Sequence, residues 1–309
     1  MAGKIAVVGS NMVDLITYVD RMPGPGETLE APDFSLGCGG KGANQAVAAA
    51  RLGSDVMMVT RVGDDIFADN TIRNFEQVGI DARHVVRVPD TSSGVAPIFV
   101  EKSGENSILI VKGANNALTP AEVDKASEDL KQCSLIVMQL EVPLETIYHV
   151  IAFGAEHGIP TLLNPAPAQP DLDVSRITGV TYLVPNESEL ELLTGMKVSD
   201  APSAEAAARS LMAKGIKTVI VTLGSKGALL VTEEACKRIE PVAVQPMDTT
   251  GAGDAFIGSF AHYFTKESDL DLALKMAARY AADSITRPGT QKSYASIEAF
   301  EAFCSKLDG

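Results

Sequence analysis

The feature that most restricts the fold of this chain is a regular alternation of short apolar runs with helical segments after residue 119. Strand-like runs are expected at 135–138, 161–163, 182–184 and 218–221, and helices at about 144–157, 188–193 and 204–214. Thr119, Pro120 and Glu122 supply the N-cap, first-turn proline and capping-box glutamate of another helix start. Strands that alternate with helices imply a mostly parallel central sheet with helices on both faces. We therefore predict an α/β fold.

The first third of the chain departs from this alternation. Local patterns there predict a strand at 5–9, a helix at 43–52 and a strand at 57–60. The apolar runs 95–101 and 107–111 flank the turn residues 103–106, which predicts a β-hairpin. This hairpin and the turn-rich residues after the first strand do not fit a parallel layer, so we expect a separate small sheet or lid. Neither a repeat nor a linker divides the chain, which predicts one domain over residues 1–309.

The length and charge of the chain exclude several classes of protein. Its 309 residues can bury one large core or two modest ones. Its 40 acidic residues against 26 basic ones give a net charge of −14, so we expect neither nucleic acid nor anionic lipid as a partner. The longest apolar runs, 135–140 and 219–223, are far shorter than a membrane span of about 20 residues. The run from Ile5 leaves no room for a signal peptide, which predicts a cytoplasmic protein.

The cysteines and histidines show no spacing that indicates a metal or redox site. Four cysteines occur without a C-x-x-C pair, at Cys38, Cys133, Cys236 and Cys304. We therefore expect neither a zinc site nor a disulfide framework. The four histidines have neither metal-ligand nor catalytic-triad spacing and are left unassigned.

A glycine-rich loop precedes the first predicted helix. Residues 37–42 read Gly-Cys-Gly-Gly-Lys-Gly and formally match the G-x-G-x-x-G fingerprint of dinucleotide-binding proteins. The match is weak, because these glycines do not follow the first strand. A Walker loop is excluded, because Lys41 is followed by Gly42 and not by Ser or Thr. Tight helix–sheet packing is the alternative, but four glycines beside Lys41 and Asn44 favour a ligand-binding loop.

A second motif lies at 248–256, with the sequence Asp-Thr-Thr-Gly-Ala-Gly-Asp-Ala-Phe. Gly251, Ala252 and Gly253 stand just before an apolar helical segment, so their N–H groups should be exposed at a helix N-terminus and bind phosphate-like charge. Asp254 follows at the start of this helix and is a candidate general base for a hydroxyl nucleophile. The alternative is an ordinary aspartate stabilised by the helix dipole. The adjoining Gly-Ala-Gly favours the catalytic interpretation.

Polar residues also follow several predicted strands. Asp14, Glu141 and Asn186 come just beyond strand-like runs, and ligands of parallel α/β sheets bind outside the carboxyl ends of the strands. Each alone is typical of a turn or cap, but together they indicate one cleft. The acids in Asn186-Glu-Ser-Glu189 start a helix, where a hard cation held through water is plausible. The glycines of residues 222–227 would let a flat or phosphorylated ligand approach.

With these residues assembled, the chain resembles the ribokinase family of sugar kinases, most specifically over residues 39–46 and 248–254. The resemblance implies an α/β domain with a β-sheet lid, formed here by about 13–37 and 93–112, through which two subunits often pair. It implies that Asp254 activates the sugar hydroxyl and that the Gly251, Ala252 and Gly253 amides form an anion hole. A homodimer that binds a pentose and ATP is the assembly we expect.

The resemblance also implies ligand contacts, position by position. The sugar would be held by Asp14, Gly39, Gly40, Lys41, Asn44 and Glu141, beside Met12 and Asp254. ATP would face Asn186, Thr222, Gly224, Ser225, Gly227 and Gly253, and Glu189 completes the N-x-x-E motif for magnesium. A potassium ion would lie at Asp248, Thr250, Ser284, Arg287, Gly289 and Ser293, mostly on main-chain carbonyls. Such an ion would steady the anion-hole loop.

One departure from the family bears on the substrate. Bacterial ribokinases commonly read Asn-x-Asp after the first strand, whereas this chain reads Met12-Val13-Asp14. A thioether cannot replace the hydrogen bond of an amide to a sugar hydroxyl, so this site should lose little with a deoxy sugar. We therefore expect an ATP-dependent kinase for the 5-hydroxyl of a pentose, with 2-deoxy-D-ribose modestly favoured. D-ribose, or both sugars, is the alternative.

Two further classes of function fit the sequence less well. A sugar- or nucleoside-binding regulator that keeps the fold without catalysis is disfavoured by the complete Gly-Ala-Gly-Asp motif. A dinucleotide-dependent oxidoreductase is disfavoured by the position of the glycine-rich loop. The acidic composition requires that ATP be held by helix N-terminal amides, metal ions and a few basic side chains such as Lys41, so magnesium should be obligatory.

Overall fold

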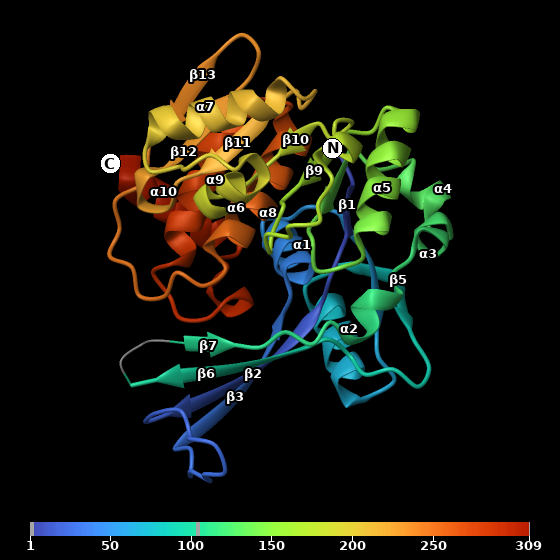
Figure 1. Ribbon diagram of the computed structural model, residues 1–309, viewed down its shortest axis with the longest axis vertical. Coiled ribbons are helices and arrows are strands. Elements are labelled where there is room, and N and C mark those ends of the chain that lie inside the picture. Colours follow the sequence, from blue (N-terminus) through green and yellow to red (C-terminus); the bar gives the residue numbers. More distant parts are fainter. Residues whose placement is uncertain (1–2, 103–105, 309) are drawn as a thin grey trace.

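The computed structural model describes residues 3–102 and 106–308, whose strands form two sheets (Figure 1). The larger sheet has nine strands in the order β13-β12-β11-β10-β9-β8-β1-β4-β5. Its strands are β1 (Ile5–Val8), β4 (Val56–Val62), β5 (Asp81–Arg87), β8 (Leu135–Met138), β9 (Thr161–Leu163), β10 (Tyr182–Leu183), β11 (Val219–Thr222), β12 (Ala228–Val231) and β13 (Cys236–Ile239). Every pairing from β5 across to β11 is parallel, and β12 and β13 extend the sheet antiparallel. The predicted α/β class is confirmed.

Helices cover both faces of the larger sheet. They are α1 (Lys41–Arg51), α2 (Ile66–Gln77), α3 (Pro120–Asp124), α4 (Ser127–Leu130), α5 (Leu144–His157), α6 (Glu187–Thr194), α7 (Ala201–Met212), α8 (Ala252–Glu267), α9 (Leu270–Ser284) and α10 (Ile297–Asp308). Alternate residues of β1 enter two separate hydrophobic clusters, Ile5 and Val7 with α1, α8 and α9, and Ala6 and Val8 with α5 and α7. This alternation is what a strand buried on both faces requires.

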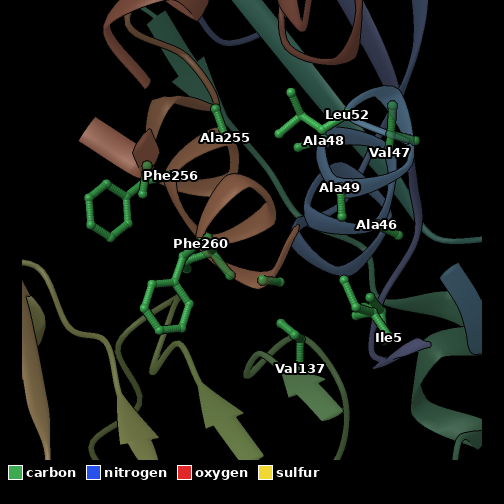
Figure 2. Packing of buried hydrophobic residues seen from close by; sticks show 14 of the residues in the cluster. Ile5, Ala46, Val47, Ala48, Ala49, Leu52, Val137, Ala255, Phe256 and Phe260 are labelled. Atoms are coloured by element: carbon green, nitrogen blue, oxygen red, sulfur yellow. The ribbon is translucent and has the colours of Figure 1, made fainter. Parts of the chain in front are cut away.

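Helices α1 and α8 pack closely against each other over the sheet (Figure 2). Small residues make this approach possible: Ala46, Ala48 and Ala49 of α1 are buried, and α8 has a glycine at position 258. A Cβ atom at Gly258 would lie 2.7 Å from the carbonyl oxygen of Gln45 and 2.9 Å from the nitrogen of Ala49. The close contact therefore depends on the missing side chain and aligns the N-terminal turns of the two helices.

The smaller sheet has the strand order β3-β2-β6-β7 and projects from the body of the molecule (Figure 1). Its strands are β2 (Met12–Val19), β3 (Asp33–Gly39), β6 (Val95–Glu101) and β7 (Asn106–Ile108). The separate sheet and the β6–β7 hairpin were both predicted and are confirmed. The predicted strand at 107–111 is wrong in part, since only an isolated bridge between Val95 and Val111 follows β7. Residues 103–105 of the predicted turn lie outside the described residues.

The predicted starts of α3 and α7 differ from the structure in how the helices are capped and where they begin. Pro120 starts α3 as expected, but the Thr119 side chain makes no cap hydrogen bond. The carboxylate of Glu122 pairs instead with Arg61 and Lys125, so the predicted capping box is wrong. Helix α7 begins three residues earlier than expected because Asp200 and Ser203 form a capping box there.

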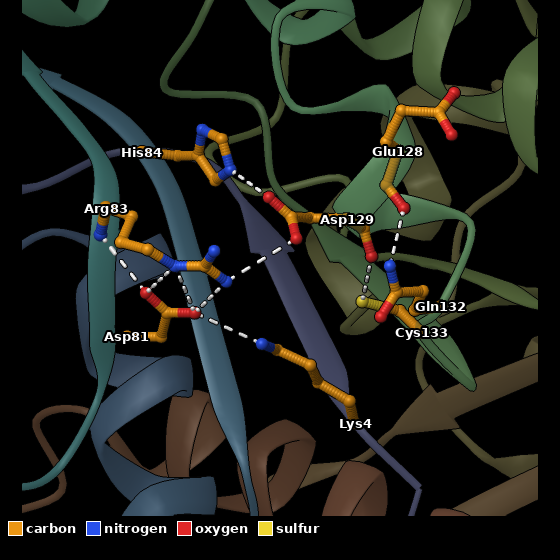
Figure 3. Close-up of polar contacts among 8 residues, drawn as sticks. All are labelled: Lys4, Asp81, Arg83, His84, Glu128, Asp129, Gln132 and Cys133. Carbon is orange, nitrogen blue, oxygen red and sulfur yellow. Dashed lines mark hydrogen bonds and ion pairs between the residues drawn. The ribbon is translucent and has the colours of Figure 1, made fainter.

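A cluster of charged side chains closes the amino-terminal edge of the larger sheet (Figure 3). Asp81 at the start of β5 pairs with Lys4, which precedes β1, at 3.1 Å and with Arg83 at 2.7 Å. His84 contacts Asp129 at 2.8 Å. Because parallel strands bind ligands at their other end, we regard this cluster as structural.

None of the helices within residues 3–102 and 106–308 has the length and apolar character that a bilayer crossing requires. All four cysteines are free in the structure.

Candidate active site

The site is centred on Asp254 in the first turn of α8. The N-cap, Gly251, has a φ of 76°, and a Cβ there would lie 2.7 Å from the hydroxyl oxygen of Tyr294. The Tyr294 hydroxyl donates a hydrogen bond to the carbonyl of Gly251 at 3.0 Å. The first N–H groups of a helix have no intrahelical acceptor, although that of Ala252 reaches the Thr249 carbonyl at 3.3 Å. The structure thus places the predicted anion-hole amides and Asp254 on one helix turn.

Two side-chain amides from α1 hold the carboxylate of Asp254. Asn44 donates through Nδ2 to Oδ2, and Gln45 donates through Nε2 to Oδ1, each at 2.9 Å. All three residues are buried. Asn44 was predicted as a sugar ligand, and Gln45 was not predicted to have a role. The structure brings both residues to Asp254 across more than 200 residues of sequence.

Glu141 and Lys41 join the glycine-rich loop to the end of β8. Oε2 of Glu141 accepts hydrogen bonds from the Ser10 hydroxyl at 2.5 Å and the main-chain N–H of Lys41 at 2.8 Å. Burial opposes the charge of the Lys41 ammonium, but attraction from Asp254, Glu141 and Glu189 outweighs it and raises the pKa of Lys41. Lys41 is therefore a fixed positive charge among these carboxylates.

Asp14 lies beyond the first strand, as expected, and belongs to β2 of the smaller sheet, within the range 13–37 expected for that sheet. It faces Gly39 on β3, where a Cβ would lie 2.6 Å from the Asp14 Cγ. Gly40, with a φ of 87°, leaves no room for a side chain, since a Cβ would lie 2.7 Å from the Met12 nitrogen. Burial, followed by repulsion from Glu141 and Asp254, raises the pKa of Asp14 to about 7. The smaller sheet thus brings a third carboxylate to the site.

Met12 lies two residues before Asp14 in β2 and therefore on the same face of the smaller sheet. Its side chain is buried, with Sδ 3.8 Å from Nδ2 of Asn115. That amide donates to the carbonyls of Asn11 at 2.7 Å and Lys112 at 2.8 Å. Asn115 was not predicted, and no local pattern marks it, because its partners come from distant segments.

The predicted nucleotide residues follow β10 and β11. Asn186 is the N-cap of α6 and forms an isolated parallel bridge with Thr222. Gly224 and Ser225 lie in a short 3-10 turn. Gly227 has a φ of 90°, and a Cβ there would collide with the carbonyl oxygen of Ile239. The structure therefore brings these residues to one loop cluster at the carboxyl ends of neighbouring strands.

Glu189 completes a capping box with Asn186. One carboxylate oxygen accepts the Asn186 main-chain N–H and the other its side-chain amide, each at 2.9 Å. Burial raises the pKa of Glu189, while its hydrogen bond from Asn186 and the charge of Lys41 act in the opposite direction. Among the described residues, no group of three or more His, Cys, Asp or Glu side chains is arranged to hold a metal ion on its own.

The predicted cation residues Asp248 and Gly289 tie the anion-hole segment to the loop after α9. Asp248 accepts hydrogen bonds from the main-chain N–H groups of Thr250 at 2.9 Å and Gly289 at 2.8 Å. Partial burial opposes ionisation of Asp248, but these hydrogen bonds outweigh it and lower its pKa. The Ser284 hydroxyl, by contrast, donates to the carbonyl of Ala281 at 2.8 Å.

Arg287 fills part of the same loop with its guanidinium. It donates two hydrogen bonds to the carbonyl of Ser293, at 2.7 and 2.9 Å, and pairs with buried Asp283. A carbonyl oxygen has two lone pairs, and the two hydrogen bonds from Arg287 engage both lone pairs of the Ser293 carbonyl. The Ser293 carbonyl is therefore not available to a potassium ion, and only its hydroxyl oxygen remains for that role.

Comparison with known proteins gives one consistent result. Residues 2–297 match the pfkB family of carbohydrate kinases. A deoxyribokinase from Salmonella typhi is 60% identical over 301 residues, which cover 97% of this chain and 98% of that protein. A ribokinase from Mus musculus is 39% identical, over 95% of this chain and 92% of that protein. The structure of an Arabidopsis thaliana ribokinase complexed with ribose and ATP superposes with a TM-score of 0.93 at 29% identity, covering 98% of this chain and 99% of that one.

Proposed function

The chain belongs to the pfkB family of carbohydrate kinases, and from this premise we propose that it transfers the γ-phosphoryl group of ATP to the 5-hydroxyl of a pentose, preferring 2-deoxy-D-ribose. Membership makes the chain a phosphotransferase with an alcohol acceptor, of the ribokinase type. The observation that carries the proposal is the Asp254 carboxylate, held by two amides beside the N–H groups of α8. The names of the Salmonella typhi and Arabidopsis thaliana proteins support the choice of sugar and nucleotide.

In the proposed reaction, Asp254 accepts the proton of the 5-hydroxyl while that oxygen attacks the γ-phosphorus of ATP. The bond from the γ-phosphorus to the β,γ-bridging oxygen breaks, and ADP leaves with its electron pair. The N–H groups at Gly251, Ala252 and Gly253 bind the negative charge on the transferring group. Lys41 balances the carboxylates around the sugar.

Glu189 suits a water-mediated contact to magnesium. Each of its carboxylate oxygens accepts one N–H from Asn186, so each keeps a lone pair for a metal-bound water. Magnesium would supply charge neutralisation for the phosphates. Its requirement remains a prediction that assays with and without the metal will test.

Potassium binding also remains a prediction. The ionised carboxylate of Asp248 suits such an ion, with the carbonyls of Thr250, Ser284, Arg287 and Gly289 as further oxygen donors. Ser293 would contribute through its hydroxyl oxygen, because Arg287 occupies its carbonyl. The ion would add positive charge to a loop that already holds one guanidinium.

We propose that the smaller sheet acts as a lid and as a dimer surface within a single domain of residues 1–309. One face carries Met12 and Asp14 towards the site, and the opposite face carries Phe34 and Leu36. Phe34 is 53% exposed and Leu36 is 49% exposed. A contiguous exposed apolar face is typical of a protein interface, which supports the predicted homodimer.

The test is a turnover assay with purified protein, ATP, magnesium, potassium and either pentose. We expect ADP formation that depends on the sugar and is faster with 2-deoxy-D-ribose. Absence of sugar-dependent ADP formation with either pentose contradicts the pentose kinase assignment. Sugar binding without turnover would support a binding regulator instead.

The preference between sugars is tested by Met12→Asn. The substitution places an amide on the sugar-facing side of β2, so we expect kcat/KM to shift towards D-ribose by about tenfold or more. Met22→Asn, at an exposed position after β2, is the control and should leave the ratio unchanged. An unchanged ratio in Met12→Asn would show that this side chain does not set the preference.

A further inference from the structure

Two relays of side-chain amides converge on Asp254. The first, which we call the Gln45 relay, runs from Gln139 through Gln45 to Oδ1 of Asp254. The second, the Asn44 relay, runs from Asn74 through Gln291 and Asn44 to Oδ2. Each carboxylate oxygen therefore receives one amide N–H from a different direction.

The Gln45 relay has a fixed polarity. Nε2 of Gln139 donates to Oε1 of Gln45 at 2.6 Å, and Nε2 of Gln45 then donates to Oδ1 of Asp254 at 2.9 Å. Turning the Gln45 amide over would place its oxygen against the carboxylate and its NH2 group against another NH2 group. The Asp254 carboxylate can only accept, so it requires the NH2 end of Gln45, and the hydrogen bond from Gln139 to the other end reinforces that orientation.

Gln45 is held further by the end of β9. Its Nε2 also lies 3.3 Å from Oδ1 of Asn164, whose own amide donates to the carbonyl of Val184 at 3.0 Å. Gln45 is 1% exposed and Gln139 is fully buried. The amide that touches Asp254 thus has little freedom to rotate.

The Asn44 relay differs in one respect that matters for a test. Asn74 donates to Gln291 at 2.8 Å, and Gln291 donates to Oδ1 of Asn44 at 2.9 Å. Asn44 is also a predicted sugar ligand, so a substitution there would change two functions at once. Gln45 contacts Asp254 without that complication.

The two hydrogen-bond donors to Asp254 are neutral amides, which suits a carboxylate that must accept a proton. Two neutral amides satisfy a buried carboxylate and fix its plane, while a charged donor would hold the negative charge more strongly and oppose protonation. Each oxygen of Asp254 keeps a lone pair that can accept a proton. Fixing the plane of the carboxylate directs that lone pair, and misplacement of a reacting group by about 1 Å can cost on the order of 100-fold in rate.

We propose that Gln45, oriented by Gln139, is a positioning residue that holds the carboxylate of Asp254 in the plane required for proton transfer from the sugar hydroxyl. The inference rests on the base role proposed for Asp254. It assigns a function to two glutamines that are not among the predicted ligand contacts.

The first variant is Gln45→Met, which keeps the length of the side chain and removes the N–H donor. We expect kcat to fall by about tenfold or more, with KM for sugar and for ATP within about twofold of the wild type. A residue that only stabilises the fold would lower the thermal midpoint without this split between kcat and KM. Ser259→Ala, a buried position on α8 away from Asp254, is the matched control and should keep the wild-type kcat.

The second variant is Gln139→Met, which removes the group that orients Gln45. We expect kcat to fall by about threefold in the wild-type background and not to fall further in the Gln45→Met background. If Gln45→Met does not fold, Gln139→Met alone carries the test. A lower kcat at unchanged KM then supports the proposal, and a wild-type kcat overturns it.

The outcomes distinguish the positioning role proposed for Gln45 from the base role proposed for Asp254, on which it rests. A wild-type kcat in Gln45→Met, while Asp254→Asn is inactive, overturns the positioning role and leaves the base intact. An Asp254→Asn variant with undiminished kcat removes the base and the positioning role together. Equal losses from Gln139→Met in both backgrounds overturn the relay, because Gln139 would then act without Gln45.

Discussion

The strands of the two sheets differ in how deeply their residues are buried. Every residue of β1, β4 and β8 in the larger sheet is buried. In the smaller sheet most of β3 is exposed or half-buried, and large apolar side chains such as Phe34 face outward. The larger sheet and its helices carry Asp254, the side-chain amides of Asn44 and Gln45 that donate to it, and the Gly-Ala-Gly turn at 251–253. The smaller sheet carries Asp14 and Met12. The proposed base and its amide donors thus belong to the fully buried part, and two of the residues proposed to face the sugar belong to the more exposed sheet.

The contrast has a physical basis. A base needs a fixed orientation, which only a fully packed interior can enforce through hydrogen bonds from several elements. A sheet that is exposed on one face has fewer contacts per residue and opens at lower free energy, as is common in segments that admit substrate. Four variants test this division, from the largest expected effect to the smallest.

Asp254→Asn, in the rigid part, should lower kcat by about 100-fold or more, because an amide cannot accept the proton of the sugar hydroxyl. KM for the sugar should stay within about threefold. Steady-state kinetics measures both. The control is Asp269→Asn, an exposed N-cap of α9 whose carboxylate accepts the Leu272 N–H. Equal activity of both variants would reduce Asp254 to a helix-cap residue.

Gly258→Ala should destabilise the protein by about 2 kcal/mol, because its Cβ would collide with α1. The gain in helix propensity offsets part of this cost. Urea denaturation measures the free energy of unfolding. Gly24→Ala is the control outside the larger sheet, since a Cβ there meets only the Glu27 side chain at 3.6 Å. If Gly24→Ala lowered the free energy of unfolding as much as Gly258→Ala does, the two regions would not differ in packing as described.

Asp14→Asn tests the electrostatics of the smaller sheet. The pKa of Asp14 is about 7 in the folded protein, above its unfolded value, so the folded state holds an extra proton between about pH 4 and 7. The contribution of Asp14 to stability is therefore greatest below pH 4 and declines as the pH rises through 7. Without sugar, Asp14→Asn should be more stable than the wild type at pH 8, by up to about 4 kcal/mol for the full shift, and nearly equal at pH 4.

Thermal unfolding at the two pH values measures this difference. The same variant should raise KM for the sugar, because the carboxylate proposed to hold it is gone. A stability gain that is independent of pH would contradict the assignment to Asp14 ionisation.

Phe34→Glu combined with Leu36→Glu should have the smallest effect on stability, below about 0.5 kcal/mol, because both side chains are exposed. The oligomeric state should change instead, from dimer to monomer in sedimentation velocity. Thr17→Glu, on the same face of the neighbouring strand but less exposed, shows how far the surface extends. A wild-type protein that is already monomeric would exclude the dimer surface.

Much of the larger sheet was predictable from the sequence because its signals are local. Helix α5 and strands β8 and β9 lie at the predicted residues, since their apolar periods are unbroken and turn residues bound them. Helices α2 and α9 and strand β5 were not predicted. Helices α2 and α9 do carry local signals, an amphipathic period and the N-caps Asp65 and Asp269, so the sequence held enough to place them. Strand β5 has no clear alternation of polar and apolar residues, and its pairing with β4 decides its structure.

The candidate site was likewise predictable only where its residues are adjacent in the sequence. The Gly-Ala-Gly-Asp motif is continuous in sequence, and the structure places its amides and Asp254 on one helix turn as expected. The relay residues Gln139 and Gln291 could not be found, because their partners lie 94 and 247 residues away in the chain. Asp14 follows the first strand as expected and lies in β2, because the chain continues into the second sheet after only a short break.

The spacing of Met12 and Asp14 in β2 has a consequence for the divergence of such proteins. Both side chains lie on one face of a strand that contributes nothing to the relays behind Asp254. Substitutions along that strand would therefore change groups proposed to face the sugar while leaving the hydrogen bonds that hold Asp254 in place. A library of variants confined to β2 would test whether changes on this one strand are enough to alter the sugar preference.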